Sequence, residues 1–170
     1  MENPNVTETV LEFYKTLPFN YYGSIEEQVK SVVQLSPIEE LYLPLKGLVT
    51  PCKNILEIGC GPGWLTNSIS NNYNKRVLGV DFNPHAIERA QAVANNLELK
   101  SEFRCEDLFK FSENKRSKEE SFDLIISLGV LHHTDNYYGA IKAICKNLLG
   151  KDGYFFVGLY HQYGRKPFLE

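Results

Sequence analysis

The chain has 170 residues, of which 43% are hydrophobic and 23% charged, and its formal net charge is -3. This length and composition are typical of one globular domain with its own hydrophobic core. The net negative charge gives no general attraction for nucleic-acid phosphates, which argues against nucleic acid as a partner. We see no signal-peptide pattern and no apolar stretch near the roughly 20 residues that span a bilayer, so we expect a cytoplasmic protein without a membrane segment.

Residues 1–50 carry mainly helical patterns, and we expect them to form an N-terminal helical cap. Apolar residues recur at helical spacing before Pro18. Ser24 and Glu27 have the spacing of a capping box, which predicts that a further helix begins there. Pro37 follows Ser36, at a position where the first turn of a helix tolerates proline.

From residue 54 onward, short apolar runs alternate with amphipathic helical patterns. The runs predict strands at residues 55–58, 77–80, 102–105, 124–128 and 154–157. The helix before the last strand is predicted to end at Gly150, and Asp152-Gly153 predicts a turn into that strand. Strands that are apolar on both faces and separated by helices indicate a parallel sheet covered on both sides. We therefore expect residues 51–170 to form an α/β, doubly wound and mostly parallel sheet.

A glycine-rich segment, Glu57-Ile58-Gly59-Cys60-Gly61-Pro62-Gly63-Trp64, follows the first predicted strand. Glycines in a strand-to-helix turn let the backbone approach a ligand closely. Asp81 ends the second predicted strand, where an acid can accept hydrogen bonds from ribose hydroxyls. The two segments together predict one nucleotide-binding crevice. The nicotinamide fingerprint would need glycine at position 64, and the tryptophan there argues against an oxidoreductase.

The spacing E-x-G-x-G-x-G at residues 57–63 resembles motif I of class I S-adenosylmethionine-dependent methyltransferases. The resemblance continues in order through residues 80–84, 105–108, 122–133 and 151–154. It implies a Rossmann-like fold and S-adenosylmethionine as the cofactor.

The resemblance also implies a set of cofactor-binding residues. Glu57 would help to hold the methionine ammonium group, Asp81 the ribose and Asp107 the adenine amino group. The backbone after the fourth strand would lie along the methionine part of the cofactor, and aromatic residues of the N-terminal cap would fold over it. The predicted set is Glu57, Gly59, Cys60, Gly61, Gly63, Asp81, Phe82, Asp107, Leu108, Leu128, Gly129, Tyr14 and Tyr22.

His132 and His133 follow the fourth predicted strand, at the sheet edge where ligands bind. An imidazole there could act as a general base on a hydroxyl or acid substrate, so both are candidate catalytic residues. The alternative is that they cap the next helix or support the loop. We predict no metal site, because His133 and Asp135 lack an evident third ligand and the four cysteines show no metal-ligand spacing.

The loop after the fourth strand lacks the Asn/Asp-Pro-Pro-aromatic signature of amino-methylating enzymes. Its Leu-His-His sequence is similar to that of the small-molecule branch of the family. The resemblance therefore implies methyl transfer to an oxygen or carbon nucleophile of a small molecule. Two alternatives stay open: a non-catalytic cofactor-binding module or inactive fragment, and a methyltransferase that acts on tRNA or protein.

The family's sheet normally has seven strands, the last two of which form a hairpin after the fifth. This chain ends at Glu170, ten residues after Tyr160. We therefore expect the hairpin to be missing and the domain to be truncated after strand five. An exposed apolar strand edge invites pairing with a second copy, which predicts a homodimer through strand five.

Overall fold

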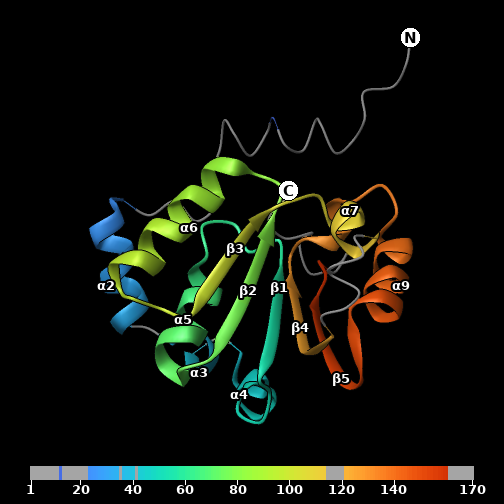
Figure 1. The fold of residues 1–170 in the computed structure, drawn as a ribbon, viewed down its shortest axis with the longest axis horizontal. Helices are drawn as coiled ribbons and strands as arrows, with labels where there is room; N and C mark the ends of the chain where they lie inside the picture. The colour runs from blue at the N-terminus through green and yellow to red at the C-terminus, as the bar shows by residue number, and fades with distance from the viewer. Residues whose placement is uncertain (1–11, 13–22, 35, 41, 114–120, 161–170) are drawn as a thin grey trace, which may run out of the picture.

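The computed structural model describes residues 12, 23–34, 36–40, 42–113 and 121–160 (Figure 1). Tyr14 and Tyr22, two of the predicted cofactor-binding residues, lie outside the described residues. Among the helices of these ranges, none combines the length and the apolar character needed to cross a membrane.

The described residues form a five-stranded sheet in the order β3-β2-β1-β4-β5, in which every neighbouring pair is parallel. The strands are β1 (Asn54–Ile58), β2 (Arg76–Asp81), β3 (Ser101–Cys105), β4 (Phe122–Leu128) and β5 (Leu149–Gly158). All five predicted strands and the predicted Rossmann-like fold are confirmed. The chain reverses its direction of travel across the sheet between β1 and β4, and such a switch point opens a crevice at the carboxyl ends of the strands.

Helices connect successive strands and cover both faces of the sheet (Figure 1). The connections contain α5 (Trp64–Tyr73), α6 (Pro84–Asn96), α7 (Leu108–Glu113), the 3-10 helix η1 (Leu131–His133) and α9 (Tyr137–Asn147). Helices α7 and α9 pack on each other, while α5 and α6 pack together with α2 (Ile25–Gln34). The central strands are therefore covered on both faces, as their apolar sequences predict.

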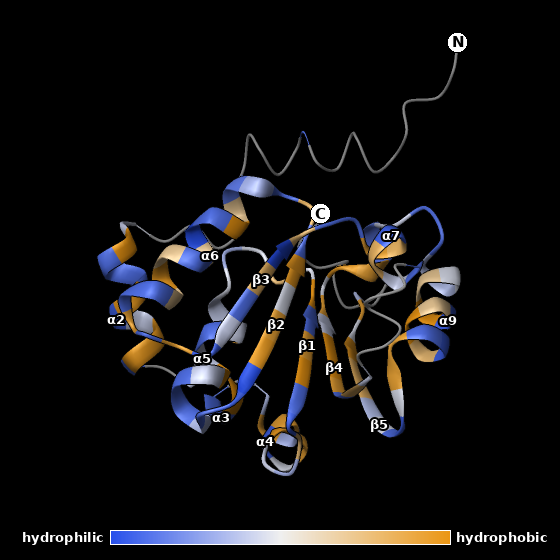
Figure 2. Ribbon diagram, viewed as in Figure 1, coloured by the Kyte–Doolittle hydropathy of each residue, from blue (hydrophilic) through white to orange (hydrophobic). Residues whose placement is uncertain are grey.

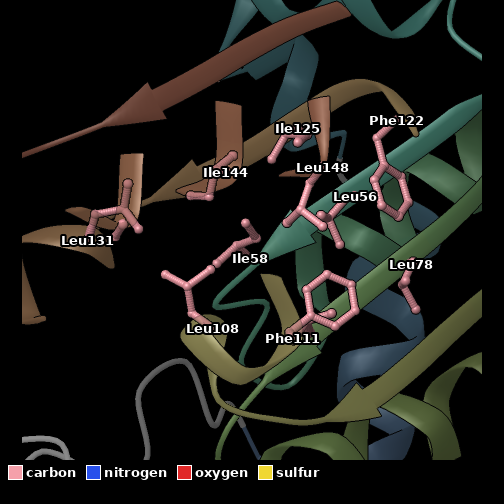
Figure 3. Packing of buried hydrophobic residues seen from close by; sticks show 12 residues of the cluster. Leu56, Ile58, Leu78, Leu108, Phe111, Phe122, Ile125, Leu131, Ile144 and Leu148 are labelled. Carbon is pink, nitrogen blue, oxygen red and sulfur yellow. The ribbon is translucent and has the colours of Figure 1, made fainter. Parts of the chain in front are cut away.

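Two clusters of buried apolar side chains fill the two faces. Leu56 and Ile58 of β1 point into one cluster with side chains from α7, η1 and α9 (Figure 3), whereas Ile55 points into the other. This alternation follows from the two-residue period of a strand. Figure 2 shows hydrophobic residues along the central strands. The core thus holds the strand ends in fixed positions around the crevice.

The described part of the N-terminal region packs against the sheet. Helices α3 (Pro37–Glu40) and α4 (Leu43–Val49) contribute Ile38, Leu45 and Val49 to the second cluster. The predicted capping box opens α2: the Ser24 amide donates to Glu27 Oε2 at 2.7 Å, and the Glu27 amide donates to Ser24 Oγ at 3.3 Å. The division into a cap of residues 1–50 and a domain of residues 51–170 stays a prediction.

The predicted boundary between α9 and β5 is wrong. Helix α9 ends at Asn147, and Gly150 already belongs to β5. A register shift lies here, because Phe122 pairs with Leu149 but Leu124 pairs with Tyr154. A Cβ added at Gly150 would lie 3.2 Å from the Phe122 carbonyl oxygen, and one at Gly153 would lie 2.8 Å from it. The glycines therefore permit a close approach between strands rather than only ending a helix.

Candidate functional site

A cleft of about 270 Å³ lies at the carboxyl ends of β1, β2 and β4. Its walls come from the glycine-rich loop after β1, the segments that follow β2 and β3, and the loop after β4. This is the position that the strand order predicts for a ligand.

The loop after β1 is held against the end of β2. The amides of Gly59 and Cys60 both donate to the carbonyl oxygen of Val80, at 2.7 and 3.2 Å. Gly61 has a φ of +51°, a conformation that side-chain-bearing residues rarely adopt. A Cβ added at Gly61 would have no neighbour within 4 Å, so the backbone here is open toward the cleft.

Gly63 has a different role from Gly61, since it is absent from the cleft walls. Its φ is +77°, and an added Cβ would lie 2.7 Å from the Cβ of Ala90 in α6. The structure therefore explains Gly63 by close packing of α5 against α6. Its predicted contact with a cofactor is not tested by this geometry.

Asp81 is the acid that joins the glycine loop to the next helix. Its Oδ2 accepts from the Gly61 amide at 2.9 Å, and its Oδ1 accepts from the Asn83 amide at 2.9 Å. Burial raises the pKa of Asp81, and the two backbone hydrogen bonds oppose that rise. The structure thus brings Asp81 and the glycine loop together, as the strand pairing predicts.

Glu57 lies at the base of the cleft and is only 6% exposed. The hydroxyl group of Thr66 in α5 donates to Glu57 Oε2. Burial raises the pKa of Glu57 to about 8, against the opposing effect of the Thr66 hydrogen bonds. The carboxyl group is therefore mostly protonated at neutral pH in the ligand-free protein. Burial also raises the pKa of the neighbouring Cys60 thiol, which disfavours the reactive thiolate.

The segments after β2 and β3 form a second wall of the cleft. Phe82, Asp107 and Leu108 all line the cleft. Oδ1 of Asp107 accepts from the amides of Phe109 and Lys110, at 3.0 and 3.2 Å. Asp107 therefore holds the first turn of α7, and its contact with an adenine amino group stays a prediction.

The loop after β4 forms the remaining wall with Leu128 and Gly129. The Gly129 amide donates to the Gly158 carbonyl oxygen at 2.9 Å, which ties the loop to β5. His133 lines the cleft, whereas His132 is not among the lining residues. The His132 ring instead lies between the rings of His133 and Tyr160, with a centroid separation of 4.1 Å to each.

Several cleft residues were missed by sequence reasoning, among them Tyr42, Trp64, Asn83, Phe109 and Tyr160. Asn83 had a signal in the Asn-Pro sequence that opens α6, and Trp64 follows the glycine segment directly. Tyr42 and Tyr160 had none, because neither belongs to a motif and only the fold brings them to the cleft. Within the described residues, no three His, Cys, Asp or Glu side chains gather as a metal site.

The raised pKa of Glu57 predicts a pH-dependent stability. A carboxyl group with a higher pKa in the folded state stabilises the fold below its unfolded pKa, and this contribution is lost as pH rises through the folded value. The wild type should therefore lose stability relative to Glu57→Gln between about pH 4.5 and 8. Thermal unfolding of both ligand-free proteins at pH 5, 7 and 9 measures this difference. Parallel pH profiles would contradict it.

Comparison with known proteins identifies the family to which the chain belongs. The methyltransferase domain family matches residues 55–153. A ubiquinone biosynthesis O-methyltransferase of Glaesserella parasuis is 32% identical over 156 residues, which are 90% of this chain and 64% of that protein. The chain thus spans somewhat less than two thirds of the length of this curated relative.

Solved structures share the fold. A Pyrococcus horikoshii protein superposes with a TM-score of 0.70 and 23% identity, over 93% of this chain and 70% of its own. Magnesium protoporphyrin IX methyltransferase from Synechocystis, solved with bound S-adenosylmethionine, gives a TM-score of 0.64 and 17% identity, over 99% of this chain and 86% of its own. Since the family match covers more than half of the 170 residues and includes the glycine loop, Asp81 and His133, the chain belongs to the methyltransferase domain family.

Proposed function

We propose that this chain binds S-adenosylmethionine in the cleft and transfers its methyl group to an oxygen nucleophile of a small molecule. The observation that carries the proposal is the meeting of two acids, Glu57 and Asp81, around the open backbone of Gly61. Family membership supplies the reaction type. The bound cofactor would supply an electrophilic methyl group on a positively charged sulfur.

The acidic side chains of the cleft suit S-adenosylmethionine better than a ligand that carries a pyrophosphate. S-adenosylmethionine has no phosphate, and it carries an ammonium group that an acid can hold. Glu57 is a buried acid that would favour its ionised form once a cation lies beside it.

Asp81 can hold a ribose while it keeps its backbone contacts. Its Oδ2 accepts from the Gly61 amide and its Oδ1 accepts from the Asn83 amide. A carboxylate oxygen has about two acceptor sites, so each oxygen can also accept from a ribose hydroxyl. The apolar side chains of Phe82 and Leu108 give a wall on which an adenine ring would lie.

The small-molecule oxygen acceptor is supported by the Leu-His-His loop and by the O-methyltransferase relative. His133 is the better candidate for the general base, because it lines the cleft and His132 does not. A base near the reacting hydroxyl would accept its proton as the oxygen attacks the methyl carbon, and the sulfur would leave with the bonding electron pair.

Cofactor binding is tested by calorimetric titration with S-adenosylhomocysteine. We expect saturable binding by the wild type and an at least tenfold weaker Kd for Asp81→Ala. Tenfold corresponds to about 1.4 kcal/mol, in the range for a lost charged hydrogen-bond partner. Asp152→Ala is the matched control, because Asp152 is exposed and does not line the cleft. A folded wild type that does not bind would refute the proposal.

The role of His133 as a general base is tested by measuring turnover. The acceptors are those found in a screen of hydroxyl and carboxylic-acid compounds. His133→Ala should lower kcat by about 100-fold and leave the S-adenosylhomocysteine Kd within threefold of the wild type, since a general base acts on the acceptor proton. Equal kcat losses in His133→Ala and His132→Ala would instead indicate that both rings support the loop.

We also propose that the chain forms a homodimer through β5, which is an edge strand of the described sheet. Its exposed apolar residues support this proposal, since Tyr154 is 53% and Val157 is 40% exposed. Light scattering should give a dimer for the wild type and a monomer for Val157→Lys. Val33→Lys places the same charge on an exposed valine of α2 and should stay dimeric. A monomeric wild type would refute this arrangement.

A further inference from the structure

A chain of hydrogen bonds reaches the glycine loop from outside the cleft. Gln28 in α2 is only 4% exposed, and its side-chain Nε2 donates to the Pro62 carbonyl oxygen at 2.8 Å. Its Oε1 accepts from Arg89 Nε of α6 at 2.6 Å. One buried amide therefore joins three segments that are far apart in the sequence.

The orientation of this amide is fixed by the chemistry of its partners. An arginine side chain has only donors, so the amide oxygen must face Arg89. A carbonyl oxygen only accepts, so the NH₂ group must face Pro62. Arg89 is itself anchored, because its Nη2 donates to the carbonyl oxygens of Gly23 and Ser24 at 2.9 and 3.0 Å. Gln28 is therefore a rigid donor toward the loop.

The Gln28 hydrogen bond fixes the peptide unit between Pro62 and Gly63. The carbonyl oxygen of this peptide accepts from Gln28, and its N–H, on Gly63, donates to the Cys60 carbonyl oxygen at 2.9 Å. Glycines at positive φ flank Pro62, and glycine allows many other backbone conformations. The loop therefore depends on such partners to keep one shape.

A second contact from the same helix reaches the adjacent residue. The indole Nε1 of Trp64 donates to Ser31 Oγ at 3.2 Å. Ser31 lies three residues after Gln28, so the two side chains share one face of α2. This face thus holds both Pro62 and Trp64, two residues that line the cleft.

We propose that Gln28 is a positioning residue that holds the glycine loop in the shape that receives S-adenosylmethionine. The inference rests on the proposed cofactor site. Gln28 does not line the cleft and acts through the Pro62 carbonyl. A residue that served only to pack α2 would affect stability without changing cofactor affinity.

The deciding variant is Gln28→Glu. A glutamate keeps the length of the side chain and an acceptor for Arg89, but an ionised carboxylate cannot donate to the Pro62 carbonyl oxygen. Gln28→Met is a second variant that removes both hydrogen bonds without adding charge. Gln91→Glu is the matched control, because Gln91 lies on α6, is not a cleft residue and donates to Asn95 Oδ1 within the same helix.

Three measurements are made on the three variants and the wild type. Titration with S-adenosylhomocysteine should give a Kd at least tenfold weaker for Gln28→Glu and Gln28→Met, and unchanged for Gln91→Glu. Hydrogen exchange of the ligand-free proteins, followed by NMR, should be faster at the Gly63 amide in the two Gln28 variants only. Melting temperatures show whether each variant is folded at the temperature of the titration.

A Kd within twofold of the wild type in the folded Gln28 variants overturns the proposal, whatever their melting temperatures. Should Gln28→Glu fail to fold, Gln28→Met decides the question by the same criterion. A folded wild type that does not bind S-adenosylhomocysteine contradicts the proposed function and the cofactor part of this inference together. The Gly63 exchange rate then still decides whether Gln28 restrains the loop, because that measurement needs no ligand.

Discussion

The hydrogen bond from the Gly61 amide to the Asp81 carboxylate is the contact on which the site depends. It joins the loop after β1 to the end of β2. Ile58 pairs with Val80 in the sheet, and this pairing brings the Gly61 amide within hydrogen-bond distance of the Asp81 carboxylate. Parallel pairing therefore brings the residues that follow each strand side by side. Packing of the two apolar clusters on the sheet fixes that register, since a shift by one residue would turn core side chains toward the wrong face.

The glycine loop after β1 must also keep one backbone shape, because Asp81 alone does not define a binding site. The loop backbone is restrained on one side by Asp81 and by the Val80 carbonyl oxygen, and on the other by Gln28 of α2. Helix α6 contributes to both sides, because Asn83 at its start bonds Asp81 and Arg89 within it bonds Gln28. The described N-terminal helix is thus part of the loop's support as well as cover for the sheet.

The cleft combines this restrained backbone with buried acids. Glu57 is held between the strand and Thr66 of α5, where burial favours its neutral form. A cationic ligand would reverse that preference, so the proposed cofactor and the protonation of Glu57 are thermodynamically linked. The wall after β4 has a different character, with His133 and the aromatic ring of Tyr160. Acids and aromatic rings therefore both line the cleft, and the proposed reaction needs groups for a cationic cofactor and for an acceptor.

The amino-acid sequence by itself predicted the five strands and the helices α5, α6 and α9 between them, because apolar periodicity is a local signal. Helix α7 and the order of the strands came only from the tertiary structure. The sequence also identified the glycine loop and Asp81, whose spacing carries the family resemblance. It misplaced the end of α9, because Gly150 serves a close contact with the Phe122 carbonyl oxygen that no local pattern reveals. Only the tertiary structure separated Gly63, which packs on Ala90, from Gly61, which faces the cleft. Likewise, only the tertiary structure brought Gln28, Tyr42 and Tyr160 to the site, because side chains distant in the sequence meet through helix and sheet packing rather than through any spacing along the chain.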